Sequence, residues 1–247
     1  MKRLFIFLLS IFSLSSQAQT EGVVHYTRTT YWTKMYSQLT FISKQEKERL
    51  AYMFSGKDDW REYTLLYFND KASKYEESDE KSDESEGYAW RKSPYMVRRD
   101  FEKNTMTDII ELAGKTYIIE DSLRQPNWKI LNDLKDVAGH ICMKAMTEDT
   151  VKKQKIVAWF AQDLPSNAGP ERLFGLPGLI LELDINDGTV LIEATKIVPK
   201  KLAQELDLPK KLKGVKLNEN GYQKALDKFI REKIKEERSP YWGGVRY

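Results

Sequence analysis

Short runs of β-branched and aromatic residues, separated by turn residues, recur along most of this chain. In residues 21–32, for example, Val23, His25 and Thr27 alternate with the residues between them, which is the two-residue period of a β-strand. The middle of the chain has no long helical repeat of the kind that connects parallel strands. The pattern therefore predicts a mainly β, α+β fold built on a meandering antiparallel sheet.

The expected strands share this composition and are separated by turn residues. They span residues 21–32, 62–68, 71–76, 95–102, 106–112, 115–120, 128–131, 137–146, 151–162, 179–185 and 189–198. Asn69-Asp70 and Asn186-Asp187-Gly188 are expected to form tight turns between paired strands. Gly139 is expected to mark a bulge. For residues 33–53 the sequence fits either an exposed helix or a hairpin loop.

One amphipathic helix is predicted near the end of the chain, at residues 220–237. Its apolar face consists of Tyr222, Leu226, Phe229, Ile230 and Ile234, at helical spacing. We expect this face to pack against the sheet, with contact between the basic face and an anionic lipid surface as the alternative. A shorter helix is expected at residues 200–205.

The first 18 residues have the pattern of a secretory signal peptide. Lys2 and Arg3 precede the apolar run Leu4–Phe12, and the small residues Ser16 and Ala18 follow two positions apart. We expect cleavage after Ala18 and a periplasmic protein. The apolar run is shorter than the roughly 20 residues that span a bilayer, so a membrane-spanning anchor is not expected. Residues 19–247 are expected to form a single domain.

Charge and cysteine content exclude two classes of protein. The net charge of +3 falls to +1 when Lys2 and Arg3 are removed, so nucleic acid is not an expected partner. Cys142 is the only cysteine and cannot form an internal disulfide. The fold must therefore depend on its own apolar core.

An acidic, serine-rich segment occupies residues 76–87. Its like charges repel one another and it has nothing to bury, which favours a mobile loop. Calcium binding is the alternative, because closely spaced carboxylates can surround a hard cation. The segment lacks the glycine and the spacing of a known calcium loop.

The most distinctive segment is Gly175-Leu176-Pro177-Gly178, which leads into the apolar run 179–185. Pro177 suits the entrance of a strand, and the glycines permit backbone shapes that a side chain would block. One interpretation is a structural corner of the sheet. The other is a turn that faces a ligand or partner, formed by these four residues and Trp159 at the end of the preceding strand.

The six residues from Gly175 to Ile180 match the signature of the GLPGLI family, a group of exported proteins of bacteria with an outer membrane. Residues 138–145 and Trp159 with its following loop also resemble the family. The resemblance implies an exported protein linked to outer-membrane transport or envelope upkeep, and it implies no catalytic residues. A fainter resemblance to periplasmic lipoprotein carriers implies a curved sheet, or half-barrel, packed on the C-terminal helix.

We expect no catalytic activity. The chain has two histidines, no Gly-x-Ser-x-Gly elbow and no His-Glu-x-x-His helix. A metal site is the alternative chemistry, because His140 and Cys142 are two apart in a predicted strand and share a face. These ligands suit copper or zinc, and His25 is a candidate third ligand.

The leading hypothesis is a non-catalytic periplasmic binding or accessory protein without a cofactor. It would hold a hydrophobic ligand or dock on an outer-membrane transport or assembly protein. Two alternatives remain: a copper- or zinc-binding protein, and a structural interaction subunit of an outer-membrane complex. The aromatic tail at residues 239–247, with Tyr241 and Trp242, would either pair with a partner's sheet edge or strap its own domain.

Overall fold

The structure is a computed structural model that describes residues 21–56, 58–79, 94–241 and 245–247. The predicted signal peptide, the acidic segment from residue 80 onward and Trp242 lie outside the described residues. Among the described residues, no helix combines the length and the apolar character needed to cross a bilayer.

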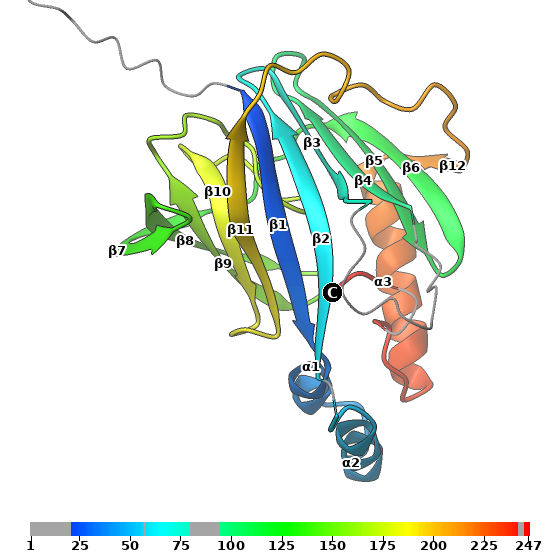
Figure 1. The fold of residues 1–247 in the computed structure, drawn as a ribbon. Helices are drawn as coiled ribbons and strands as arrows, with labels where there is room; N and C mark the ends of the chain where they lie inside the picture. The colour runs from blue at the N-terminus through cyan, green and yellow to red at the C-terminus, as the bar shows by residue number, and fades with distance from the viewer. Residues whose placement is uncertain (1–20, 57, 80–93, 242–244) are drawn as a thin grey trace, which may run out of the picture.

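The chain folds around one 12-stranded sheet (Figure 1). Its strands are β1 (Gly22–Tyr31), β2 (Asp59–Phe68), β3 (Ala72–Glu77), β4 (Tyr95–Asp100), β5 (Thr105–Leu112), β6 (Lys115–Ser122), β7 (Lys129–Val137), β8 (His140–Asp149), β9 (Gln154–Ala161), β10 (Leu179–Ile185), β11 (Val190–Pro199) and β12 (Val215–Leu217). The prediction of a mainly β, antiparallel fold is confirmed. The exception is β12, which pairs parallel to β6.

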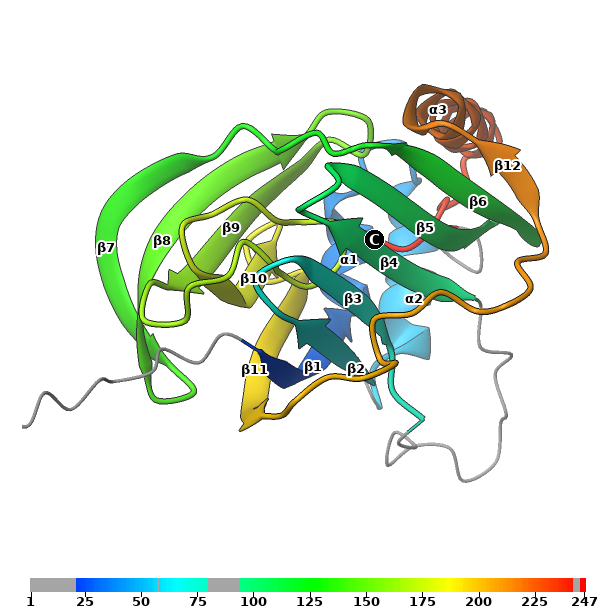
Figure 2. The same ribbon diagram turned by 90° about the horizontal axis from the view of Figure 1, so that it is seen from above.

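The sheet consists of two antiparallel meanders. Strands β1 to β6 follow one another in space, as do β7 to β11, and the pairing of β1 with β11 joins the two sets. Viewed from above, the sheet curves so that the two meanders form facing arms (Figure 2). The C-terminal end of the chain lies between these arms.

The tight turns follow from residues that accept positive φ. Asn186, Asp187 and Gly188 have φ values of 52°, 52° and 83°, which confirms the predicted turn between β10 and β11. The predicted bulge at Gly139 is wrong. Ala138 and Gly139, at φ 52° and 83°, instead form a two-residue turn that ends β7 and begins β8.

Three helices complete the described fold: α1 (Trp32–Gln38), α2 (Lys44–Met53) and α3 (Glu219–Lys235). Residues 33–53, for which the sequence fits either a helix or a hairpin loop, are helical in α1 and α2. These two helices lie beyond the ends of β1 and β2 (Figure 1). Helix α2 begins at Ser43, whose side chain accepts a hydrogen bond from the Glu46 amide. The short helix predicted at residues 200–205 is wrong, because residues 200–202 have no regular structure and residues 203–205 form bends and a turn.

Helix α3 is amphipathic as predicted, with Tyr222, Leu226 and Ile230 buried. It packs on β6 and β12, at one arm of the sheet, instead of filling the middle of the concave face. Ile234 is 38% exposed because the last turns of the helix run past the sheet. The concave middle is occupied by other segments.

Those segments are the loop between β9 and β10, at residues 162–178, and the tail. Leu164, Ala168 and Leu176 of this loop join the hydrophobic core. Beneath them lie large buried side chains of the inner face, including Tyr26 and Phe160. Full burial of such a side chain contributes about 2–3 kcal/mol. The Tyr26 hydroxyl also donates to the Ile180 carbonyl oxygen at 2.5 Å, which ties the loop exit to β1.

Candidate functional site

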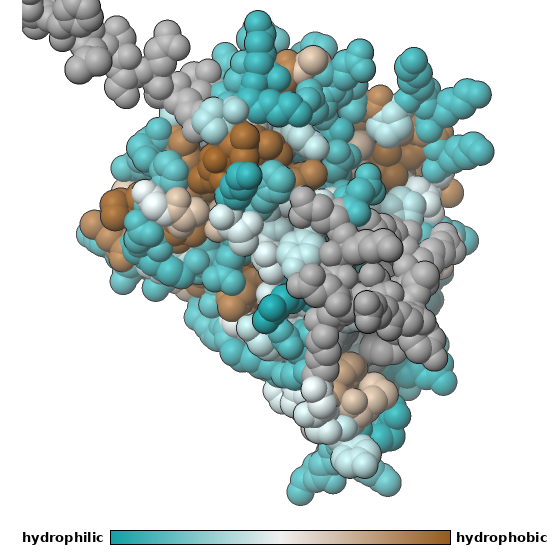
Figure 3. All heavy atoms as spheres, in the orientation of Figure 1, coloured by the Kyte–Doolittle hydropathy of each residue, from teal (hydrophilic) through white to brown (hydrophobic). Residues whose placement is uncertain are grey.

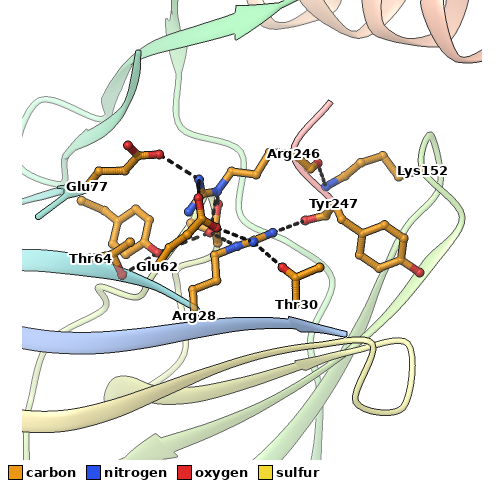
Figure 4. A network of polar contacts seen from close by, with 10 residues as sticks. Arg28, Thr30, Glu62, Thr64, Glu77, Lys152, Arg246 and Tyr247 are labelled. Carbon is orange, nitrogen blue, oxygen red and sulfur yellow. Dashed lines mark hydrogen bonds and ion pairs between the residues drawn. The ribbon is translucent and has the colours of Figure 1, made fainter. Parts of the chain in front are cut away.

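A network of charged and hydroxyl groups lies on the concave face of the sheet (Figure 4). We call it the polar cluster, and it joins three strands, the 162–178 loop, the β8–β9 turn and the tail. Its members are Arg28, Thr30, Glu62, Thr64, Tyr75, Glu77, Lys152, Glu171, Arg246 and Tyr247.

Six of the ten cluster members lie on strands β1, β2 and β3. On β1, Arg28 falls on the same inward face as Val24 and Tyr26, and its side chain is 5% exposed. Its cross-strand neighbour on β2 is Glu62, and the Arg28 Nη1 to Glu62 Oε2 distance is 2.8 Å. Residues opposite each other in an antiparallel pair share a face, so register alone brings these two charges together.

Glu171 is the acidic centre of the cluster. Its carboxylate accepts from Arg246 Nε at 2.9 and 3.0 Å and from the Tyr75 hydroxyl at 3.3 Å. Arg28 Nε lies 3.3 Å from the same carboxylate as an ion pair. Burial acts to raise the pKa of Glu171, but the charges of Arg246 and Arg28 outweigh burial, so the pKa is lowered. Its φ of 56° is unusual for a residue other than glycine.

The tail supplies two further members of the cluster, Arg246 and Tyr247. Arg246 lies over the Tyr95 ring at 4.3 Å and also bonds Glu77 at 3.2 Å. The Tyr247 backbone oxygen accepts from Arg28. Tyr241 is buried and packs edge-to-face on the Tyr247 ring, with ring centroids 4.6 Å apart. The described part of the tail is therefore a strap on its own domain, the second of the two alternatives.

The neighbour of Glu171 belongs to a second buried ionic group. Arg172 Nε bonds Asp108 at 2.8 Å, and another of its nitrogens bonds Glu219 at the start of α3. Asp108 is fully buried and also pairs with Arg99. Two adjacent loop residues thus fasten the loop to the tail on one side and to α3 on the other.

The chemistry of the polar cluster is that of paired charges. Its central carboxylate is held ionised by two arginines, which removes the raised pKa that a general acid needs. Burial lowers the pKa of Lys152, against the opposing effects of Asp149 and Glu171. Buried ion pairs of this kind fix the relative positions of segments.

Residues Gly175–Gly178 lie where the loop enters β10, and their packing fits the first of the two interpretations, a corner of the sheet. Gly175, at φ 91°, leaves no room for a Cβ beside the Gln125 side chain, which donates to its carbonyl oxygen at 2.6 Å. At Gly178, a Cβ would lie 2.3 Å from the Ala161 carbonyl oxygen. Leu176 is buried and Pro177 is exposed. Close backbone packing accounts for Gly178, and the positive φ accounts for Gly175.

Trp159 points to the opposite face of β9 from the buried Ala158 and Phe160. Lys135 and Lys144 each place an ammonium group 5.6 Å from the centre of its ring. Lys135 also bonds the buried Glu182 carboxylate at 2.6 and 2.7 Å. The Trp159 ring is therefore contacted by lysine side chains of β7 and β8.

The candidate metal ligands do not form a ligand set. His140 Nδ1 lies 2.7 Å from Asp163, whereas Cys142 is fully buried and its thiol contacts the His140 carbonyl oxygen. Burial raises the pKa of the Cys142 thiol to about 12, which opposes the thiolate that metals bind. Across the described ranges, no three His, Cys, Asp or Glu side chains gather closely enough to hold a metal ion.

A group of exposed apolar side chains marks the free edge of the sheet at β7. Ile130 and Leu134 on β7 are 46% and 65% exposed, and Ile141 on β8 is 62% exposed. Strand β7 pairs with β8 and ends the sheet order. Apolar surface is visible in Figure 3 at the margin where Figure 1 shows β7 and β8. Contiguous exposed apolar side chains of this kind indicate an interaction site.

The best-formed pockets of the described residues open to solvent. One, of about 500 Å³, is lined by Tyr67, Lys74, Glu76, Ala203, Gln204 and Glu205. The other, of about 390 Å³, lies over β1, β2 and β11 and includes His25, Thr27 and Lys196. Both have mixed polar walls, unlike the enclosed apolar cavity that a lipid carrier needs.

The segment that carries the distinctive corner also matches a family model, described as "protein of unknown function (Porph_ging)", over residues 143–182. The match runs from β8 through β9 and the loop into β10. No curated protein matches the sequence.

The fold is similar to that of PNGF-II, solved in two crystal forms. In the C2 form the TM-score is 0.55 at 15% identity, with 84% of this chain and 32% of PNGF-II covered. In the P21 form the TM-score is 0.56 at 13% identity, with 84% and 33% covered. The chain thus spans about a third of the length of PNGF-II. At such low identity the similarity shows the fold alone.

Sequence reasoning missed Glu171, Arg172 and Arg246. They lie in a loop and a tail, where no hydrophobic periodicity indicates which side chains are buried. A signal did exist for Arg28, since the alternation of β1 places it on the same face as Val24 and Tyr26. An arginine on an apolar strand face requires a buried acidic partner.

Proposed function

We propose that this protein is an exported, non-catalytic interaction subunit of an envelope complex, docking through the β7 edge of its sheet. The observation that carries the proposal is the exposure of Ile130, Leu134 and Ile141 together on the terminal β7–β8 hairpin. An edge strand presents unpaired backbone groups, and apolar side chains beside them favour pairing with another chain.

The filled concave face supports docking over the carriage of a hydrophobic ligand. A half-barrel carrier keeps its concave side open for an acyl chain. Here that side holds the polar cluster, the 162–178 loop and the strap. Arg28 and Glu171 are 5% and 11% exposed at its centre, and insertion of an acyl chain would separate these charges.

The same ion pairs support a non-catalytic role. Glu171, the most enclosed carboxylate of the polar cluster, is committed to Arg246 and Arg28. Within the described residues, the His140 imidazole contacts the Asp163 carboxylate and not a nucleophilic side chain. The geometry favours the structural alternative over the copper or zinc alternative.

The proposal also includes export to the periplasm and a relation to the GLPGLI family. The match at residues 143–182 includes Gly175–Ile180, in keeping with a protein of the GLPGLI type. We place the mature protein in the periplasm after cleavage following Ala18, with an outer-membrane transport or assembly complex as its site of action. Mass spectrometry of the processed chain tests the cleavage, and an N-terminus other than Gln19 would contradict it.

In-cell photocrosslinking tests the docking surface. A photoreactive amino acid at position 134 should yield a discrete protein adduct in the envelope fraction. The matched control is position 228 on α3, where Lys228 is 76% exposed but lies far from the sheet edge in sequence and fold. Absence of an adduct at position 134, or the same adducts from both positions, would contradict the proposal.

A further inference from the structure

We propose that the partner at the β7 edge is a second copy of this chain, paired antiparallel through β7 about a two-fold axis at Leu134. This inference rests on the proposed docking role of the edge, and names its occupant. Identical edges that meet about a two-fold axis form a closed, self-complementary interface.

The first support is that β7 buries little on either face of the strand. Of its nine residues, Val137 alone is buried and Leu131 is intermediate, while the other residues are exposed. A strand of a half-covered sheet normally shows alternating burial. Exposure of both sets of side chains therefore leaves β7 ready to receive cover from another chain.

The second support is the direction of the backbone N–H and C=O groups of β7. The two-residue turn at Ala138-Gly139 makes Val137 and His140 its flanking pair, which share hydrogen bonds across the hairpin. Because hydrogen bonding alternates along an antiparallel strand, the N–H and C=O groups of Asp136 and Leu134 point away from β8. These groups are the ones that a neighbouring strand would bind.

Charge then selects one register. A two-fold axis at Leu134, where the regular pairing of β7 with β8 ends, places Asp133 opposite Lys135 of the second copy, twice. Lys135 is 43% exposed and also bonds Glu182 of its own chain, and Asp133 is 56% exposed. An axis at residue 133 or 136 opposes two aspartates, and an axis at residue 135 opposes two lysines. Opposite charges across an antiparallel pair stabilise it and like charges destabilise it.

Apolar contact reinforces the same register. The two Leu134 side chains would lie opposite each other on one face of the joined sheet. Met143 is the cross-strand neighbour of Leu134 on β8, and Ile141 lies beside it on the same face. Pairing would thus create a continuous apolar strip across four strands and cover Leu134, which is now 65% exposed.

Sedimentation velocity and disulfide trapping test this arrangement on the full chain from Gln19 onward. The protein should sediment as a concentration-dependent dimer. Asp133→Lys should weaken the dimer about tenfold, because the new lysine would face Lys135 of the other copy at both symmetric positions. Asp207→Lys, the same charge change at an exposed position outside the sheet, is the control and should leave the dimer unchanged.

Leu134→Cys should form an intermolecular disulfide, since hydrogen-bonded antiparallel neighbours have Cα atoms about 5.5 Å apart, within disulfide range. Asp136→Cys, opposite Asn132, should not. A monomer at all concentrations, or equal trapping at both positions, would overturn the inference. A monomer that still crosslinks to a different envelope protein at position 134 would overturn self-pairing while retaining the proposed docking function.

Discussion

Arg28 and Glu171 form an ion pair across the concave face of the sheet, with Arg28 Nε 3.3 Å from Glu171 Oε1. One residue comes from the first strand and the other from the loop between β9 and β10. Arg246 from the tail contacts the same carboxylate, so one acidic side chain joins three distant segments. These three residues lie in the middle of the concave face, whereas the exposed apolar residues Leu134 and Ile141 lie at the β7 edge of the sheet.

Removing the charge of Glu171 tests its structural role. Glu171→Gln leaves two buried arginines without their shared counter-ion, and we expect a loss of about 3 kcal/mol in the free energy of unfolding. Urea denaturation measures this loss. The control is Glu102→Gln, because Glu102 is 62% exposed and its contact with Lys71 is 3.6 Å long. If both variants unfold at the same urea concentration, the cluster does not hold the segments together.

Acid should weaken the same contact. The pKa of Glu171 is lowered in the folded protein from its ordinary value of 4.5. The stabilisation is therefore complete above that ordinary value and is lost as the pH falls through the lower, folded pKa. The free energy of unfolding should fall less steeply in acid for Glu171→Gln than for the unmodified protein. Parallel acid profiles would show that Glu171 does not contribute.

The corner glycines should differ sharply from a turn glycine. Gly178→Ala forces a Cβ to within 2.3 Å of the Ala161 carbonyl oxygen at φ 154°, and we expect a loss of about 3 kcal/mol. Gly114→Ala is the control, since Gly114 has φ 77° but open space around it. Its cost should be about 1 kcal/mol, from backbone conformation alone. Thermal unfolding compares the two, and equal losses would mean that close packing at the corner is unimportant.

Cys142 should be inert in the folded protein. Burial raises the pKa of its thiol to about 12, so the reactive thiolate is scarce at neutral pH. A thiol reagent should label Cys142 only as fast as the protein unfolds, and fully in urea. An introduced thiol in Lys228→Cys, at an exposed position, should react at once. Rapid native labelling of Cys142, or copper(I) uptake by the thiol, would contradict its buried, neutral state.

Local patterns made most of the sheet predictable. Alternation located β1, a continuous apolar run located β10, and Asn186-Asp187-Gly188 marked the turn after β10 because these residues accept positive φ. Ser43 and Glu46 also carried a readable capping signal for α2, although charge around them obscured it. The bulge assigned to Gly139 failed because one glycine suits a bulge and a two-residue turn equally well.

The polar cluster was not predictable, for a physical reason. Glu171 and Arg246 lie outside any periodic element, and their burial depends on pairing with residues remote in sequence. Register explains only the contact of Arg28 with Glu62. The amphipathic pattern predicted which face of α3 is buried, but the strands on which it packs depend on contacts remote in sequence, such as those of Arg172 with Tyr222 and Glu219.

Native mass spectrometry of the protein purified from the bacterial envelope tests most directly whether the molecule docks on another chain instead of carrying cargo. The spectrum should contain one and two processed chains with no added mass, since the concave face is filled by its own residues. A single chain that retains a constant extra mass, extractable as lipid, would contradict the account.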